Sequence, residues 1–256
     1  PTSAWISSSD ASSHRHTQAA MKKLTRDQIA ARVISGDLPA GGALPSERDL
    51  AAALHVSRPA IREALKRLAT SGLVHIRQGD TTTVRDIRRD GGLDLLPLLL
   101  VNDDGLDISV ARSAVEARAA IAPIVAGLAA TRMSAAGFDQ LHAAVDEITA
   151  ETDPLALQVL ALEFWDRIVD GAESIVYRLM FNTLRAAYEP ALPALSVAMA
   201  GEVGQVDGYR ALVAALENRD APGARQAADD LLSPSTTALL AVFDAAAQFD
   251  GGSDDH

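Results

Sequence analysis

The stretch "LPSERDLAAALHVSRPAIREALKRLATSGLV", residues 44–74, decides the fold of the first part of the chain. It follows a helical apolar repeat and carries four arginines and one lysine. We expect Ser46 to cap the N-terminus of one helix and Ser57 to cap that of a second helix, because serine side chains accept hydrogen bonds from free backbone amides. Only a short turn at residues 55–56 separates the two helices. This pattern predicts a helix-turn-helix.

The second of these helices separates its apolar and its charged residues onto two faces. Its apolar face consists of Ala60, Ile61, Ala64, Leu65 and Leu68, and its cations Arg58, Arg62 and Lys66 form a stripe at spacings of four residues. A cation near a helix N-terminus opposes the helix dipole, so Arg62 is a poor choice for stability alone. The stripe therefore favours contact with an anionic partner. The competing interpretation is an ordinary solvated helix face.

The residues that follow this helix predict a wing. Residues 73–87, "LVHIRQGDTTTVRDI", alternate apolar and polar side chains on both sides of residues 78–80, which is typical of a β-hairpin. Before the helix-turn-helix, residues 17–35 have apolar side chains at helical spacing. A first helix, a helix-turn-helix and a two-stranded wing make up a winged helix-turn-helix, which we expect to span residues 17–86.

The helix-turn-helix residues resemble those of a known family. Residues 44–74 are similar, almost without a gap, to the DNA-binding motif of the GntR family of bacterial transcription regulators. The resemblance implies that Arg48, Arg58 and Arg62 meet operator DNA, and that Gly79 lets the wing tip approach the minor groove. The chain departs from the family at this tip, where Asp80 stands in place of a common basic residue. The residues expected to bind DNA are Arg48, Ser57, Arg58, Arg62, Lys66 and Gly79.

Charge divides the chain into two parts. The formal net charge of −11 is made up of +5 over residues 1–90 and −16 over residues 91–256. This asymmetry indicates a basic module joined to an acidic one, and only the basic module suits a phosphate backbone. We expect a disordered leader at residues 1–16, a linker at 87–92 and a disordered acidic tail at 249–256.

The acidic module predicts an all-helical bundle over residues 93–248. It is rich in alanine and leucine, and its prolines separate segments of helical length. Those prolines are Pro123, Pro154, Pro190, Pro193, Pro222 and Pro234. The expected fold class is mainly α, with an N-terminal winged helix-turn-helix and a C-terminal all-helical bundle for effector binding and dimerisation.

Composition argues against several other classes of protein. The 256 residues include no cysteine, so a disulfide framework, a thiolate nucleophile and a cysteine-ligated zinc are excluded, which fits a reducing cytoplasm. The longest strongly apolar run, residues 93–101, is far shorter than the roughly 20 residues of a membrane span, so no membrane partner is expected. An enzyme with a helical domain is a less favoured alternative, because no GxSxG motif, phosphate loop or paired-histidine spacing is present. We expect no catalytic residue and no cofactor.

Three segments of the acidic module, residues 107–133, 162–192 and 208–232, resemble the FadR subfamily of the GntR family. Most members of that subfamily bind a divalent metal through an aspartate and three histidines. The matching positions here hold Ala161, Trp165, Tyr209 and Leu231, which are not a usable ligand set. His142 is the one histidine within residues 93–248 and is expected to be a surface or partly buried residue. The sequence therefore predicts a bundle without a metal.

The metal-free members of the subfamily resemble the fatty-acid regulator after which it is named, whose effector is a long-chain acyl-CoA. The resemblance implies an acyl-CoA or a fatty acid as effector, and the clustering of aromatic side chains near two arginines within residues 164–188 is compatible with one. The expected ligand-binding residues are Arg112, Phe164, Trp165, Tyr177, Arg178, Phe181, Asn182, Arg185, Tyr188 and Tyr209. Two alternatives stay open: a plain bundle core with solvated arginines, and a site in which Arg112 holds a small carboxylate.

Together these features predict a homodimeric, ligand-responsive transcription regulator, with a role in fatty-acid or lipid metabolism. A single recognition helix reads only a few base pairs, so a two-fold dimer on a palindromic double-stranded operator is expected. The effector is expected to lower the affinity for the operator.

Overall fold

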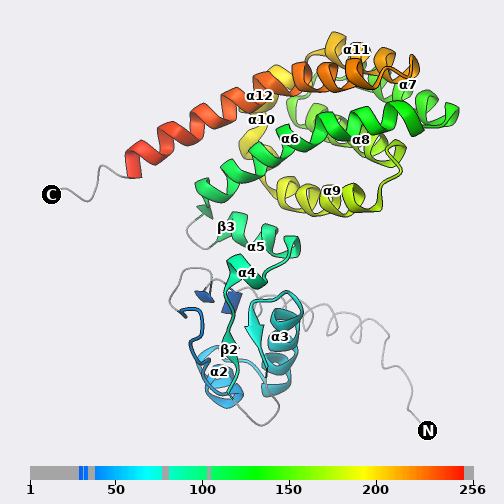
Figure 1. Cartoon of the computed structure of the whole chain (residues 1–256). Helices are drawn as coiled ribbons and strands as arrows, with labels where there is room; N and C mark the ends of the chain where they lie inside the picture. Colours follow the sequence, from blue (N-terminus) through cyan, green and yellow to red (C-terminus); the bar gives the residue numbers. More distant parts are fainter. Residues whose placement is uncertain (1–28, 31, 34–37, 77–80, 103–104, 251–256) are drawn as a thin grey trace, which may run out of the picture. The chain divides into compact units, whose positions relative to one another are not determined.

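The computed structural model describes residues 29–30, 32–33, 38–76, 81–102 and 105–250 (Figure 1). It divides the chain into two compact units, Pro1–Asp103 and Asp104–His256. Each unit has its own hydrophobic core. The fold class predicted from the sequence is confirmed, since the first unit contains a helix-turn-helix and the second is helical.

The helix-turn-helix consists of α2 (Glu47–Ala53) and α3 (Arg58–Thr70). The Ser46 hydroxyl accepts a hydrogen bond from the amide of Asp49 at 3.2 Å, and the Ser57 hydroxyl accepts one from the amide of Ala60 at 3.4 Å. Both predicted caps are therefore confirmed. The turn between the helices places His55 at a positive φ of 53°, which reverses the chain within a few residues. The predicted apolar face of α3 is also confirmed, because all five of its residues are buried.

The wing pairs β1 (Val74–His75) with β2 (Thr83–Val84) in antiparallel register. Val74 lies opposite Val84, and both side chains are buried against α3 and the rest of the first core. The described residues Ile29, Ala30 and Val33 also belong to this core. The predicted wing tip at residues 78–80, which includes Gly79, lies outside the described residues.

The boundary between the two units falls later than the sequence suggested. The expected linker at residues 87–92 instead contains α4 (Ile87–Asp90), and the chain continues through η1 (Leu93–Leu95), α5 (Leu96–Leu100) and β3 (Val101–Asn102). Leu95 is fully buried in the first core, which explains why these short elements belong to the first unit. Gly72, at a φ of +77°, permits this packing, because a Cβ there would lie 2.4 Å from the carbonyl oxygen of Asp90.

The second unit is the predicted all-helical bundle. Its elements are β4 (Gly105–Leu106), α6 (Ile108–Arg132), α7 (Ala135–Ala150), α8 (Pro154–Gly171), α9 (Ile175–Tyr188), η2 (Glu189–Ala191), α10 (Leu192–Val203), α11 (Val206–Glu217) and α12 (Ala221–Asp250). Asp107, Ser134 and Asp153 cap α6, α7 and α8 through their side-chain oxygens. The expected leader at residues 1–16 lies outside the described residues, whereas α12 extends two residues into the expected tail.

The longest helices, α6 and α12, run antiparallel along each other (Figure 1). Arg112 of α6 contacts Asp244 of α12, while near the other end a Cβ on Gly127 would lie 2.5 Å from the Arg225 side chain. Pro123 and Pro234 lie inside these two helices, so the expectation that every proline separates helices is wrong at both positions. Burial along the shared face offsets the backbone hydrogen bond that each proline removes.

By length and composition alone, α6 is apolar enough to span a membrane. In this structure it packs along α12 and against α8, and part of its surface belongs to the core of the second unit. Arg118 in its middle forms an ion pair with Glu202 of α10. These contacts are those of a bundle helix.

Candidate DNA-binding surface and buried polar cluster

The cations of α3 share one exposed face with an acid from α2. Arg58, Arg62 and Lys66 are exposed, and the Arg62 side chain is 57% accessible to solvent. Arg62 donates hydrogen bonds from Nε and Nη2 to the two carboxylate oxygens of Glu47, at 3.1 and 2.8 Å. The hydrogen bond from Arg62, together with the charges of Arg58 and Lys66, lowers the pKa of Glu47. The predicted cationic stripe therefore exists, and it surrounds one carboxylate.

Arg48 and Ser57, which are also expected to contact DNA, differ in their interactions within the protein. The Arg48 side chain on α2 is 81% exposed, and its Nε lies 3.6 Å from the Asp49 carboxylate. Ser57 uses its hydroxyl as the cap of α3. An exposed arginine at the start of each helix and a row of cations along α3 form a surface that suits the phosphates and base edges of a duplex.

The bundle contains a polar cluster that spans five helices. Glu202 of α10 is 1% exposed and accepts hydrogen bonds from Arg118 of α6 and from the Ser235 hydroxyl of α12. Arg118 also donates to that hydroxyl at 3.4 Å. Nearby, the Tyr188 hydroxyl of α9 donates to Oε1 of Gln158 on α8 at 2.8 Å. A buried charge is tolerated only when it is paired in this way.

Tyr209 of α11 interacts electrostatically with the charged residues of this cluster. Burial alone would lower the pKa of Arg118, but the charge and the hydrogen bond of Glu202 raise it. Burial raises the pKa values of Tyr188 and Tyr209, and the Glu202 carboxylate adds to both effects while Arg118 opposes them. Both tyrosines therefore stay protonated and keep a hydroxyl proton to donate.

Three buried polar atoms near this cluster have no hydrogen-bond partner among the described residues: Nε2 of Gln158, Nε1 of Trp165 and the hydroxyl of Tyr209. Gln158 and Trp165 lie two turns apart on α8, and Phe164 packs edge-on against both Trp165 and Tyr209. A buried donor without a partner costs about 1–3 kcal/mol, so these three atoms are candidates for contact with a further acceptor.

Comparison with known proteins adds the family. Residues 22–84 match the family model "Bacterial regulatory proteins, gntR family", and residues 113–233 match the FCD domain. The chain is 52% identical over 216 residues to the HTH-type transcriptional regulator Mce2R of Mycobacterium tuberculosis, which covers 84% of this chain and 90% of Mce2R. The chain belongs to the GntR family. It is a DNA-binding transcription regulator with an FCD domain, and its relatives are regulators rather than enzymes.

Two further proteins are similar to this GntR regulator. The fatty acid metabolism regulator protein of Pasteurella multocida is 28% identical over 64% of this chain and 67% of its own length. A solved structure of Lar, described as controlling the agr system of Listeria monocytogenes, matches with a TM-score of 0.57 at 14% identity. That match covers 86% of this chain and 96% of Lar, and it concerns the fold alone.

Some of the residues expected to bind a ligand lie together in this GntR regulator, where Phe164 packs against Trp165 and Tyr209. Others are held in ion pairs. Phe164, Trp165 and Tyr209 are buried in the core, Tyr177 and Phe181 pack against it, and Asn182 is exposed. Arg178 donates to the Asp166 side chain at 2.8 Å and also contacts Asp170, and Arg185 donates to Glu189 at 2.7 Å. Arg112 contacts Asp244 and lies 3.9 Å from Glu116. Each of the three arginines already has an acidic partner.

The sequence pattern did not predict four residues of this cluster: Arg118, Gln158, Glu202 and Ser235. A signal was present for Glu202, which is the one charged residue between Glu189 and Asp207. Such a charge is either solvated or paired inside the core, and only the packing of α10 against α8 and α12 distinguishes the two cases.

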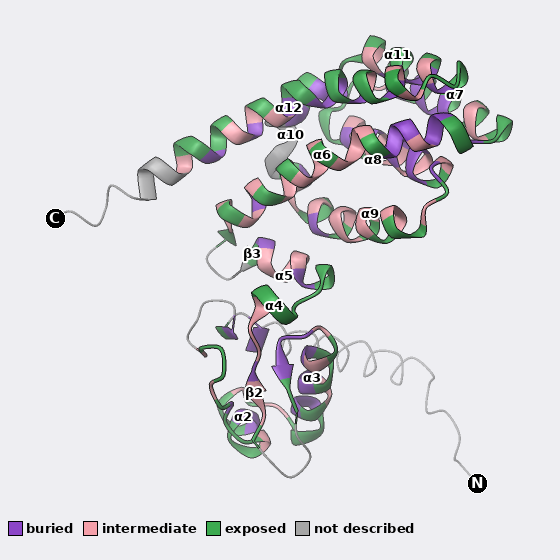
Figure 2. Cartoon of the chain, viewed as in Figure 1, coloured by how far each residue is buried: buried purple, intermediate pink, exposed green. Residues whose placement is uncertain are grey.

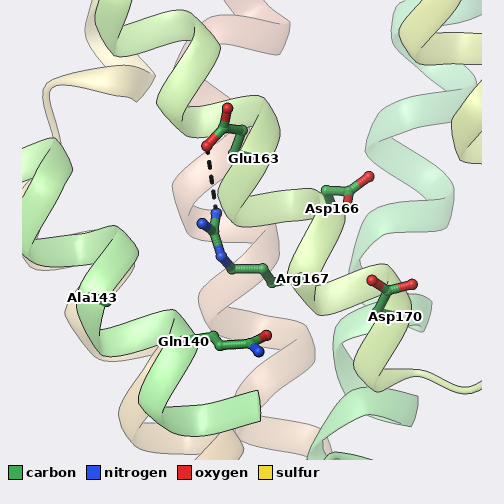
Figure 3. A pocket seen from close by; sticks show the side chains of 6 residues that line it. All are labelled: Gln140, Ala143, Glu163, Asp166, Arg167 and Asp170. Atoms are coloured by element: carbon green, nitrogen blue, oxygen red, sulfur yellow. Dashed lines mark ion pairs between the residues drawn. The ribbon is translucent and has the colours of Figure 1, made fainter. Parts of the chain in front are cut away.

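A polar groove lies between α7 and α8 (Figure 3). It has a volume of about 500 Å³, and its lining residues are Gln140, Ala143, Glu163, Asp166, Arg167 and Asp170. Arg167 pairs with Glu163, and Asp166 and Asp170 pair with Arg178 of α9. The groove is open and its charges are already paired, so it is a weaker candidate than the buried cluster.

Chelation is expected to leave the thermal stability and the DNA binding of the protein unchanged. Ala161, Trp165, Tyr209 and Leu231 are all buried in the core of the second unit. Among the described residues no group of three or more histidine, aspartate or glutamate side chains could hold a metal ion. His142 is exposed and pairs with Glu217 at 2.8 Å. Thermal melts with and without EDTA test this expectation, and stoichiometric zinc or nickel in untagged protein would contradict it.

Proposed function

We propose that this GntR-family regulator is a ligand-responsive homodimer that acts in the cytoplasm and binds a palindromic operator. The row of exposed cations along α3 carries this proposal, because it lies on a helix whose opposite face is anchored in the first core. One such helix reads only a few base pairs, and a two-fold dimer places a second copy on the other half-site. The proposed DNA contacts are Arg48, Ser57, Arg58, Arg62, Lys66 and the wing-tip Gly79.

Arg62→Ala is expected to reduce discrimination between operator and random DNA by roughly 5- to 150-fold, if Arg62 reads a guanine. The ligand for this measurement is the duplex that the wild-type protein selects from a random library, compared with a scrambled duplex of equal composition. Lys66→Ala is the control, since loss of a phosphate contact weakens binding to both duplexes alike. If Arg62→Ala also weakened both alike, Arg62 would be a backbone contact.

The proposed effector is a long-chain acyl-CoA or fatty acid that lowers operator affinity. Three observations support it: the similarity to a fatty acid metabolism regulator, the buried aromatic pair Phe164 and Trp165, and the partly buried Tyr177 and Phe181 against the same core. An acyl chain needs an apolar, aromatic lining of this kind. The regulated genes would then belong to fatty-acid or lipid metabolism.

A small carboxylate is the second candidate, and the buried polar cluster favours it. Gln158, Trp165 and Tyr209 offer three donors that have no partner in the described part of the chain, and Arg118 lies near Tyr188 and Tyr209. An anionic oxygen is the acceptor that such donors bind best. Arg112, which the sequence suggested for this role, lies six residues before Arg118, and both arginines are paired with acids. Arg118 is the better placed cation because its charge acts on Tyr209.

Mass spectrometry of ligands that co-purify with the native protein separates the two candidates. A fatty-acyl species that weakens operator binding when it is added back supports the lipid proposal. A small carboxylate with the same effect replaces it. A ligand that binds equally well to free and operator-bound protein contradicts both, because an effector acts only through its differential affinity.

A further inference from the structure

The ion pair between Glu47 and Arg62 joins the two helices of the DNA-binding motif. The residues are 15 positions apart, on α2 and α3, and the contact is bidentate, with Nε to Oε1 at 3.1 Å and Nη2 to Oε2 at 2.8 Å. Both bonds use the same edge of the guanidinium, the side-on edge formed by Nε and Nη2. A contact of this kind fixes the plane of the guanidinium as well as its position.

The ion pair with Glu47 leaves the end-on edge of the Arg62 guanidinium available to donate hydrogen bonds. An arginine has five N–H donors, and the two bonds to Glu47 leave the forward-facing protons of Nη1 and Nη2 unused. Those two protons form the end-on fork that matches O6 and N7 of guanine. The Arg62 side chain is 57% exposed, so this fork is accessible from solvent.

We propose that Glu47 is a specificity-determining positioning residue, which holds Arg62 in the orientation that reads a guanine in the major groove. This inference rests on the proposed role of Arg62 in base reading. An unrestrained arginine side chain loses conformational entropy when it binds a base. The ion pair with Glu47 already restricts Arg62 in the absence of DNA, so less entropy is lost on binding. The Glu47 carboxylate also repels phosphates, so it weakens random binding while it strengthens base reading.

A competing role for Glu47 would be inhibition of DNA binding. In that case the carboxylate would hold Arg62 away from DNA, and removing it would tighten binding to the operator. The two roles predict opposite changes in operator affinity. They also differ in the ratio of operator to random affinity, which a general electrostatic effect leaves unchanged.

Glu47→Ala in the full-length protein tests the proposal. The expected result is a fall of at least about 5-fold in the ratio of affinities for the selected duplex and the scrambled duplex. Affinity for the scrambled duplex should stay the same or rise, because a negative charge has been removed. Glu63→Ala is the matched control, since it removes the same charge from α3 and leaves the Glu47–Arg62 pair in place. Thermal melts of both variants show that the first unit is folded.

The double variant Glu47→Ala/Arg62→Ala shows whether Glu47 acts through Arg62. If it does, the ratio for the double variant equals that for Arg62→Ala alone, so the two losses are not additive. A normal or raised ratio for Glu47→Ala, beside a lowered ratio for Arg62→Ala, would overturn the positioning role and leave the base contact intact. An unchanged ratio for Arg62→Ala would overturn the base contact, and the positioning role with it.

Discussion

Replacing Arg118 by methionine is expected to lower the free energy of unfolding of the helical unit by about 3 kcal/mol. The substitution keeps an unbranched side chain but removes the cation that neutralises Glu202. Glu202 is 1% exposed, so among the described residues its carboxylate would keep only the hydrogen bond from Ser235. The expected loss is at the lower end of the range for buried pairs, because the Arg118 side chain is 28% exposed.

Chemical denaturation followed by the fluorescence of Trp165 measures this loss, because Trp165 lies in the bundle core. A Trp5→Phe background removes the second tryptophan of the chain. Arg112→Met is the matched control on the same helix, and it should cost less than about 1 kcal/mol because its acidic partners are exposed. The double variant Arg118→Met/Glu202→Leu should recover most of the stability, since no buried charge is left unpaired. Equal losses for Arg112→Met and Arg118→Met would contradict a buried role for this pair.

Lengthening an acyl-CoA is expected to tighten its binding to the bundle by about 4-fold for each methylene, until the chain fills the available space. Four methylenes then correspond to a change on the order of 200-fold. The increase arises because each methylene leaves water for an apolar lining such as that around Phe164 and Phe181. The operator should weaken acyl-CoA binding by the same factor by which acyl-CoA weakens operator binding.

Titration of operator release with acyl-CoAs of increasing length measures this dependence. Free CoA is the control, because it carries the head group without the chain. A flat response across the series would contradict the acyl proposal. It would instead favour the small carboxylate, whose affinity depends on donors such as Gln158 and Tyr209 and not on chain length.

The DNA-binding motif could be predicted from the sequence because its signals are local. Ser46 and Ser57 cap helices through amides only three residues away, and the buried face of α3 follows from its own periodicity. The burial of Leu95 could not be predicted from such local signals. The glycines at residues 91–92 break the helical pattern as a linker would, yet Leu95, three residues after them, lies in the first core.

The buried polar cluster could not be predicted in the same way, because its partners are far apart in the chain. Arg118 meets Glu202 and Ser235 across separations of 84 and 117 residues. Arg112 carries the same charge on the same helix, and its side chain is exposed to a similar degree, 32% against 28% for Arg118. The two differ in that the acid paired with Arg118 is buried, which depends on the packing of α12 along α6 and of α10 against α12.

The antiparallel pairing of α6 and α12 also sets an order for folding during synthesis. The first helix of the bundle is translated long before its partner, which begins at Ala221, so the core between them cannot close until α12 has left the ribosome. The first core draws on residues between Ile29 and Leu99, so it can form while the bundle is still being made. A chain that stops before Phe243 and Asp244 would therefore keep a folded DNA-binding unit but lack the last contacts of α12 with α6.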